Sequence, residues 1–224
     1  MENIFEFLRS NFWHVAPILA AGAVAVLIII ERSKALLVSY PMKSMNGFFE
    51  KLRDFVMADR LADAVAFCDR YEGKPVAIVA RAGLLRAHQP ETLIEDGLDL
   101  ALGKAQQMIQ KRTTFLSAIA NVATLLGLFG TIMGLIQSFQ AVGSSNAQQR
   151  SALLASGIST AMNATMLGLS VAIPCMVAFS FLMNRTNTLL ADTEQAATET
   201  LDLIKQRYYA AEIEAVRSPL KKVG

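Results

Sequence analysis

The chain has 224 residues, of which 53% are apolar, 18% charged and 8% aromatic, and its mean hydropathy is +0.38. Soluble globular proteins carry about 25% charged residues, so this composition is displaced toward membrane proteins. The Lys, Arg, Asp and Glu residues all avoid three windows of 21, 37 and 34 residues, which are residues 10–30, 113–149 and 151–184. This segregation excludes an ordinary soluble enzyme. A net charge of +2, with no basic patch interleaved with aromatic residues, gives no support to nucleic-acid binding.

Each window is long enough for a helix that spans the bilayer, which needs about 20 apolar residues. The windows lack the period-two alternation of barrel strands. We therefore predict an all-α integral membrane protein with three transmembrane helices and long cytoplasmic helical extensions. The expected segments are an N-terminal segment with the first helix (1–31), a cytoplasmic loop (32–112), the second helix (113–142), a short non-cytoplasmic loop (143–156), the third helix (157–184) and a cytoplasmic tail (185–224).

The first window has two interpretations. The small residues Ala20–Ala23 are typical of the cleavage region of a secretory signal peptide. Only Arg9 is basic before the window, however, and the apolar run continues to Ile30. These features favour an uncleaved membrane helix.

The distribution of Lys and Arg predicts the orientation. The segment 31–112 holds 13 of them and the tail from Arg185 holds six, whereas the N-terminal flank and the 143–157 connection hold one each. Cytoplasmic loops are enriched in Lys and Arg. We expect a periplasmic N-terminus and a cytoplasmic C-terminus.

The segments with charges predict amphipathic helices. Apolar residues recur every three or four positions over 48–70, and a second helix is expected over 76–87. No proline occurs between residues 91 and 173, so 92–141 is compatible with one helix of about 50 residues. The two cysteines, Cys68 and Cys175, lie in different environments and no disulfide is expected.

Small and polar residues form a stripe on each of the later two membrane helices, at intervals of three and four. The stripe of the second helix is Thr124, Gly127, Thr131, Gly134 and Ser138, and that of the third is Ala161, Thr165, Gly168, Ala172 and Cys175. One interpretation is helix packing alone, which small residues commonly serve in membranes.

The other interpretation is an ion path. Neither membrane helix contains Asp, Glu, Lys, Arg or His, although such residues usually form intramembrane proton relays. A proton path here therefore needs a carboxylate from a partner chain. Thr131, Thr165, Asn163 and Ser138 could supply the hydroxyl and amide groups that bind it or orient water. No catalytic or metal-binding constellation is present, so we predict neither an enzyme nor a metal site.

Two segments carry a family resemblance. The sequence LGLFGTIMGL at 126–135 resembles the LGLxGTVxGI segment of the ExbB, TolQ and MotA proton-channel proteins. The sequence AMNATMLGL at 161–169, followed by Ala172-Ile173-Pro174, is similar to their ALxATxxGLxxAIP segment. Glu31-Arg32 with Leu36 resembles their ERxxxL junction at the end of the first helix. Three spans rather than four place the chain nearer to ExbB and TolQ than to MotA.

This resemblance implies a homopentamer in the bacterial inner membrane, whose second and third helices surround a dimer of an ExbD- or TolR-like single-span protein. Each partner helix brings one intramembrane Asp, and proton passage drives work in the envelope, such as transport or surface motility. H⁺ is the transported ion and no cofactor is implied. Thr131 and Thr165 match the pore threonines of the family, and Thr124 joins the expected pore-lining set. Gly127, Gly130, Gly134, Gly168 and Pro174 are expected to serve helix packing.

Asn163 and Met133 depart from the family pattern, because an apolar residue and a bulky residue such as tryptophan are common at these positions. Pro174 either makes the third helix pliable or is tolerated without functional motion. Glu31 and Arg32 are expected as charges at the membrane interface, with Glu31 pairing locally to Arg32 or Lys34 or relaying protons. The alternative function is a membrane scaffold that conducts no ions.

Overall fold

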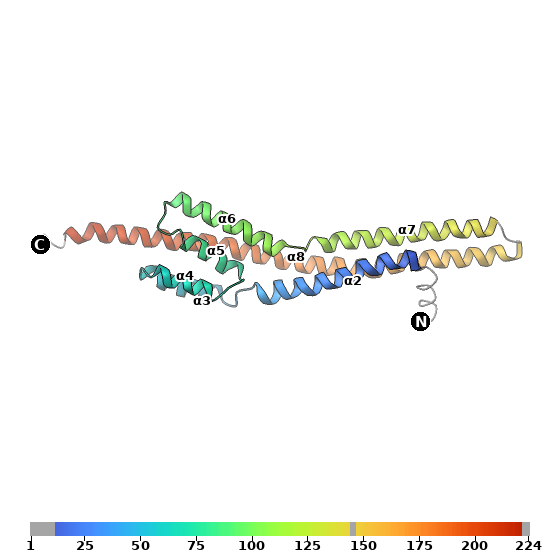
Figure 1. Cartoon of the computed structure of the whole chain (residues 1–224), viewed down its shortest axis with the longest axis horizontal. Coiled ribbons are helices and arrows are strands. Elements are labelled where there is room, and N and C mark those ends of the chain that lie inside the picture. The colour runs from blue at the N-terminus through green and yellow to red at the C-terminus, as the bar shows by residue number, and fades with distance from the viewer. Residues whose placement is uncertain (1–11, 144–146, 221–224) are drawn as a thin grey trace. The chain divides into compact units, whose positions relative to one another are not determined.

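The computed structural model describes residues 12–143 and 147–220, with side chains for 15–143 and 148–210. The described residues form helices and no strands (Figure 1). The predicted all-helical class is confirmed. The order of elements is α2 (Phe12–Lys34), the π-helical turn η1 (Ala35–Ser39), α3 (Met45–Met57), α4 (Leu61–Asp69), α5 (Pro75–Leu84), α6 (Glu91–Gln110), α7 (Phe115–Gly143) and α8 (Ala147–Leu220).

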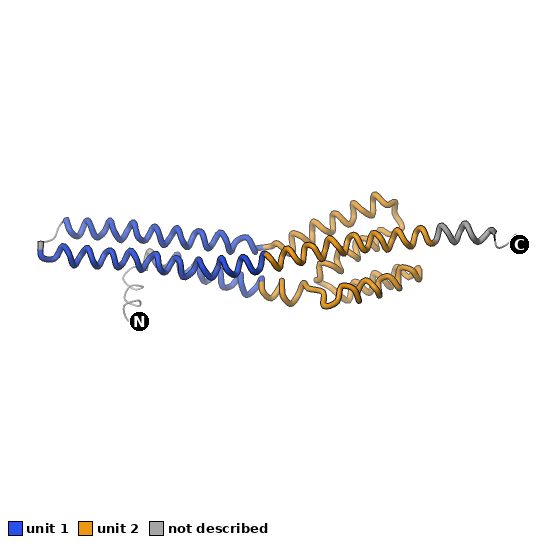
Figure 2. The backbone as a smooth tube through the Cα atoms, turned by 180° about the vertical axis from the view of Figure 1, so that it is seen from behind, with its two compact units in different colours: residues 1–32, 112–183 blue, residues 33–111, 184–224 orange. Residues whose placement is uncertain are grey.

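The chain divides into two compact units (Figure 2). Unit 1 comprises residues 1–32 and 112–183, and unit 2 comprises residues 33–111 and 184–224. Because α8 contains 74 residues, it contributes to both units. Among the described residues, the helical stretches Val15–Ser39, Glu91–Gly143 and Gln148–Ala210 are each long and apolar enough to include a membrane span.

Unit 1 is held together by close approach between helix backbones. A Cβ placed on Gly168 of α8 would lie 2.7 Å from the carbonyl oxygen of Ala123 and 3.0 Å from the Cα of Gly127, both on α7. A Cβ on Gly22 of α2 would lie 3.2 Å from a methyl group of Val171 on α8. Small residues allow membrane helices to approach in this way and gain dispersion contacts. Glycine at 168 therefore sets the distance between α7 and α8.

Unit 2 is a small helical bundle with an aromatic centre. Phe48 stacks on Phe67 with ring centroids 5.4 Å apart, and Tyr71 meets both rings edge-on. The core of buried apolar side chains also includes Leu52 and Val56, together with residues of α5, α6 and α8. The stripe predicted over 48–70 enters this core on α3, where Phe48, Leu52 and Val56 are buried. On α4 the prediction was wrong, because Ala62 and Ala66 are exposed and the buried residues are Ala64, Phe67 and Cys68.

The residues expected to form one helix over 48–70 form two. Asp59 adopts a left-handed backbone conformation (φ 58°) between α3 and α4. Asp is one of the few residues that tolerate this conformation. Its carboxylate accepts hydrogen bonds from Arg207 of α8, at 2.9 Å from Nε and 2.5 Å from Nη2. A long-range ion pair thus accompanies the break, and no local propensity predicts it.

The single helix expected over 92–141 is also interrupted. Residues 111–114 separate α6 from α7, with an extended ψ of 128° at Lys111 and φ 61° at Arg112. The guanidinium of Arg112 binds the carboxylate of Glu31, with Nη1 at 2.9 and 2.7 Å from its two oxygens. We expected Glu31 to pair with Arg32 or Lys34, whereas its ion-pair partner in the structure is Arg112.

Two other boundaries differ from expectation. Helix α5 begins at Pro75, which is favoured in the first turn, and ends at Leu84 rather than at residue 87. Residues 147–156 of the expected 143–156 loop are already helical, while residues 144–146, like residues 1–11 of the N-terminal segment, lie outside the described residues.

Replacing Gly168 with Ala should destabilise unit 1 by about 1–3 kcal/mol, because the added methyl group meets backbone atoms that can yield only if α7 and α8 separate. The matched control is Gly103→Ala in α6, where a Cβ meets nothing within 4 Å. That change should be neutral or stabilising by up to about 1 kcal/mol. Thermal unfolding in detergent, followed by circular dichroism, measures both. Equal melting temperatures for the two variants would contradict the packing described above.

Cys68 provides a test of the core of unit 2. Burial, with the nearby carboxylate of Asp69 as a smaller cause, raises the pKa of the Cys68 thiol from 9.0 to about 12. The reactive thiolate is then about a thousandfold scarcer near pH 7.5 than at the ordinary pKa. Maleimide should modify Cys68 slowly in the folded protein and rapidly after denaturation, as quantified by mass spectrometry of the peptide. Rapid modification of Cys68 in the folded protein would contradict this burial.

Candidate functional site

Helices α7 and α8 lie side by side and antiparallel in unit 1 (Figures 1 and 2). We call their buried contact line the seam. Its positions on α7 are Leu116, Ala120, Ala123, Gly127, Gly130, Gly134 and Ser138, and those on α8 within unit 1 include Ala161, Ala164, Gly168, Ala172 and Cys175. Nearly all of these side chains are small, as close backbone contact requires.

The threonines of the two predicted stripes lie beside the seam rather than in it. Thr131 and Thr165 are half-buried, whereas Ala164 is the residue in contact with Gly130. A Cβ on Gly130 would lie 2.6 Å from the Cβ of Ala164. Each stripe therefore combines two functions, with glycine and alanine in the seam and threonine on its flank.

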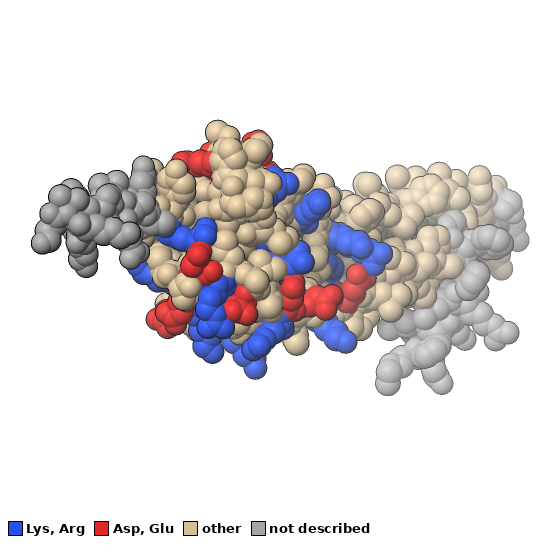
Figure 3. Space-filling model, turned by 60° about the vertical axis from the view of Figure 1, so that its left-hand side comes forward, with Lys and Arg blue, Asp and Glu red and all other residues tan. Residues whose placement is uncertain are grey.

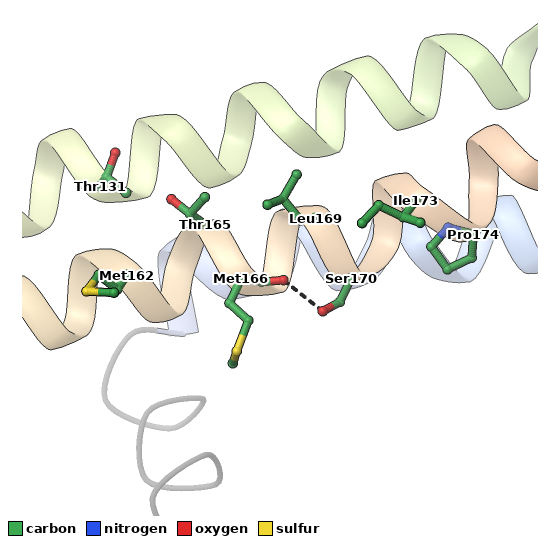
Figure 4. A pocket seen from close by; sticks show the side chains of 8 residues that line it. All are labelled: Thr131, Met162, Thr165, Met166, Leu169, Ser170, Ile173 and Pro174. Carbon is green, nitrogen blue, oxygen red and sulfur yellow. Dashed lines mark hydrogen bonds between the residues drawn. The ribbon is translucent and has the colours of Figure 1, made fainter.

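On this flank, a groove of about 760 Å³ runs along α8 (Figure 4). We call it the threonine groove. Thr131 of α7 lines it from one side, and the remaining lining residues all belong to α8. These are Met162, Thr165, Met166, Leu169, Ser170, Ile173 and Pro174. None of the lining side chains is ionisable.

The hydroxyl groups in the groove differ in their partners. Thr131 donates to the carbonyl oxygen of Leu128 at 2.6 Å, and Ser170 donates to that of Met166 at 2.7 Å (Figure 4). Within the described part of the chain, no hydrogen bond of the Thr165 hydroxyl is found. An unpaired hydroxyl is costly in a membrane interior, so the Thr165 hydroxyl is available to a polar group of another chain.

The other residues predicted to line a pore are placed elsewhere. The Thr124 hydroxyl donates to the carbonyl oxygen of Ala120 at 3.0 Å, outside the threonine groove. Ser138 is buried in the seam, where it donates to the carbonyl oxygen of Gly134 at 2.8 Å. A Cβ on Gly157 would overlap the Ser138 side chain, so these two residues pack tightly. Asn163 precedes Thr165 by two residues, which is about 200° around the helix, and it does not line the groove.

The residues predicted for helix packing are divided between two places. Gly127, Gly130, Gly134 and Gly168 all lie in the seam, where added Cβ atoms would contact the facing helix. Pro174 instead lines the threonine groove. Helix α8 continues past it to Leu220, so this proline does not end the helix.

The two interface charges also differ. Glu31 is half exposed in its ion pair with Arg112, which joins the end of α2 to the start of α7. Arg32 is buried, with 2% of its surface exposed. The ion pair between Glu31 and Arg112 therefore connects α2 to the residues that precede α7. The described residues contain no cluster of three or more His, Cys, Asp or Glu side chains that could hold a metal ion.

Sequence reasoning did not select the apolar wall of the groove. Met162 lies three residues before Thr165 and Leu169 four residues after it, with Ile173 a further four residues along. These intervals place all three on the face of Thr165. The spacing that identified the threonine could therefore have identified its neighbours.

Comparison with known proteins agrees with this architecture. A model of the MotA/TolQ/ExbB proton channel family matches residues 72–195, more than half of the chain. The Tol-Pal system protein TolQ of Haemophilus influenzae is 33% identical over 106 residues, which are 46% of each chain. The biopolymer transport protein exbB1 of Vibrio cholerae is 26% identical over 201 residues, which are 89% of this chain and 85% of that protein.

The residues matched by the family model include both the threonine groove and the seam. With three helices suited to crossing a membrane and relatives named TolQ and ExbB, this is a bacterial inner-membrane protein. The chain belongs to the MotA/TolQ/ExbB proton channel family, near its ExbB and TolQ members.

Proposed function

We propose that this chain is the proton-conducting subunit of an inner-membrane motor that couples the proton-motive force to mechanical work in the cell envelope. The observation that carries the proposal is the threonine groove, where Thr165 offers a hydroxyl with no partner in the described chain and no ionisable group is present. Because the chain belongs to a proton channel family, we interpret this arrangement as part of a proton path.

The missing ionisable group comes from a partner. We infer that five copies of this chain surround two single-span helices of an ExbD- or TolR-like protein, each with one intramembrane Asp. A proton binds the Asp carboxylate from the periplasmic side, and the neutral carboxylic acid later releases it to the cytoplasm. Hydroxyl groups can donate to the carboxylate and accept from the acid, so Thr165 can serve both states.

The proposed orientation follows from the positive-inside rule. The segments rich in Lys and Arg, including the helices of unit 2, lie in the cytoplasm, while the connection between α7 and α8 faces the periplasm. The relatives are named for biopolymer transport and for the Tol-Pal system. These names support our proposal of a function in the cell envelope.

A membrane scaffold without ion conduction is the second candidate. The seam supports it, because small residues at such positions serve helix packing in any membrane protein. The two candidates differ in the groove, since a scaffold does not depend on a hydroxyl at position 165.

Replacing Thr165 with Val removes the hydroxyl at nearly constant shape. We expect proton flux through the native complex in proteoliposomes to fall about 10- to 100-fold, because a hydrogen bond to a charged group contributes about 1.5–3 kcal/mol. The measurement is the uptake of protons reported by an internal pH dye under an imposed potential.

The matched control is Thr160→Val, also on α8. The Thr160 hydroxyl donates to the carbonyl oxygen of Ser156 at 3.1 Å and does not line the groove. Its flux should equal that of the unmodified complex. If Thr165→Val conducted as well as this control, the hydroxyl would have no part in conduction. An unmodified complex with no proton flux would instead favour the scaffold.

A further inference from the structure

Unit 2 exposes a groove between α5 and α6 whose charges are all positive. It has a volume of about 350 Å³, and its charged lining residues are Arg81, Arg86 and Lys104. We call it the basic groove. Leu85 and Leu100 also line it and remain 48% and 56% exposed. Exposed leucines beside a groove in a charged region are typical of a contact surface.

Two of the three basic side chains have no carboxylate partner among the described residues. The Arg86 side chain lies across Gly97 and donates to the carbonyl oxygen of Leu93 at 3.1 Å, while Lys104 is exposed. Arg81 differs, because it pairs with Asp69 at 2.6 Å. The basic groove therefore carries positive charge that unit 2 leaves uncompensated.

A second surface, between α3 and α8, has the opposite character. It is hollowed by about 290 Å³, and Glu50, Glu199 and Asp202 line it. We call it the acidic face. Glu199 accepts a hydrogen bond from Gln195 at 2.7 Å, and Asp202 accepts one from Gln206 at 2.6 Å. Neutral amides thus hold two of these carboxylates.

Other carboxylates of unit 2 are paired with cations. Asp59 binds Arg207, Asp63 binds Arg60 and Glu91 binds Lys205, at 2.5–2.7 Å. The one cation on the acidic face, Arg53, donates to the amide oxygen of Gln206 at 3.2 Å. Figure 3 shows basic and acidic side chains mixed on one face of the molecule. The basic groove and the acidic face are therefore distinguished by charged side chains that lack an oppositely charged partner, and not by charge alone.

The two surfaces lie at the same level of the bundle. A Cβ placed on Gly83 of α5 would lie 2.8 Å from the side chain of Leu98 on α6 and 2.9 Å from that of Thr200 on α8. Leu98 lies between Gly97 and Leu100 of the basic groove, and Thr200 lies between Glu199 and Asp202 of the acidic face. Copies related by a rotation axis parallel to α8 can therefore join the two surfaces without sliding past one another.

We propose that the basic groove of one copy of this chain binds the acidic face of the next copy. The contact joins two different surfaces, so it is heterologous, and repeated around an axis it closes into a ring. This inference rests on the homo-oligomer of the proposed function and assigns the surfaces that build it. Charge complementarity favours a second copy as the occupant, because every copy presents both surfaces in equal number.

Charge reversal tests the pairing in the full-length protein. Lys104→Glu or Asp202→Lys alone should raise the concentration at which the assembly half-dissociates by about tenfold, because attraction becomes repulsion. The variant with both changes should recover assembly, since the charges are exchanged across each contact. Native mass spectrometry and light scattering in mild detergent count the subunits. Arg70→Glu, an exposed site on neither surface, is the control for net charge and should behave as the unmodified protein.

Cross-linking keeps the proposal testable if a reversal impairs folding. Cys68 and Cys175 are both buried, so cysteines added at exposed positions 104 and 202 should react first. With Lys104→Cys and Asp202→Cys in one chain, a short bis-maleimide should yield a ladder of multimers, whereas either change alone should yield at most dimers.

Unchanged assembly in both single reversals, or no ladder from the double-cysteine variant, would overturn the assigned surfaces. The outcome is separable from conduction, because Thr165→Val should leave the subunit count unaltered. If the charge-reversed variants assembled and conducted protons like the unmodified protein, the proposed function would stand and only the proposed interface would be wrong.

Discussion

The close approach of α7 and α8 is the constraint on which unit 1 depends. Gly168 and Gly127 bring the two backbones into contact, which no larger side chain at 168 would permit. Because the seam is occupied by atoms from both helices, Thr131 and Thr165 lie on its flanks, while most seam positions hold small side chains. The threonine groove is a consequence of this packing, and its position is set by Gly130 and Ala164 as much as by Thr131 and Thr165.

The absence of ionisable side chains from the groove has the same physical origin. A charge in a seam this tight would be desolvated without room for a partner, and a charge on the flank would face the bilayer in a lone copy. This lack of ionisable groups is why the proposed function takes its titrating carboxylate from a partner. In the proposed function, the carboxylate of the partner also couples conduction to assembly, because the proton path forms only when the partner helix occupies the groove.

The spans, the seam glycines and the two groove threonines could be predicted from the sequence, because charge depletion and three-and-four spacing are local properties. The two helix breaks could not. Asp59 and Arg112 are the non-glycine residues with positive φ in the described chain, and each belongs to an ion pair with a residue distant in sequence, Arg207 and Glu31 respectively. A break that depends on a partner 81 or 148 positions away leaves no local signal.

Residue type alone was also an insufficient guide to the site. Asn163 is polar and close to Thr165 in sequence, yet helical geometry places it on another side of α8, and its role stays a prediction. Ser138 belongs to the predicted stripe by spacing, but its hydroxyl is satisfied within α7 and its side chain packs on Gly157. Spacing defines a face of a helix, whereas the facing helix decides which of its residues remain accessible.

The central claim is that this chain conducts protons only with a carboxylate supplied by a partner. The most direct measurement compares proton flux into proteoliposomes containing the chain alone with flux into proteoliposomes containing the complex purified with its single-span partner. The account predicts no flux above the lipid background for the chain alone, and flux with the complex that is lost when the intramembrane carboxylate of the partner is neutralised. Proton flux through the chain alone would contradict it.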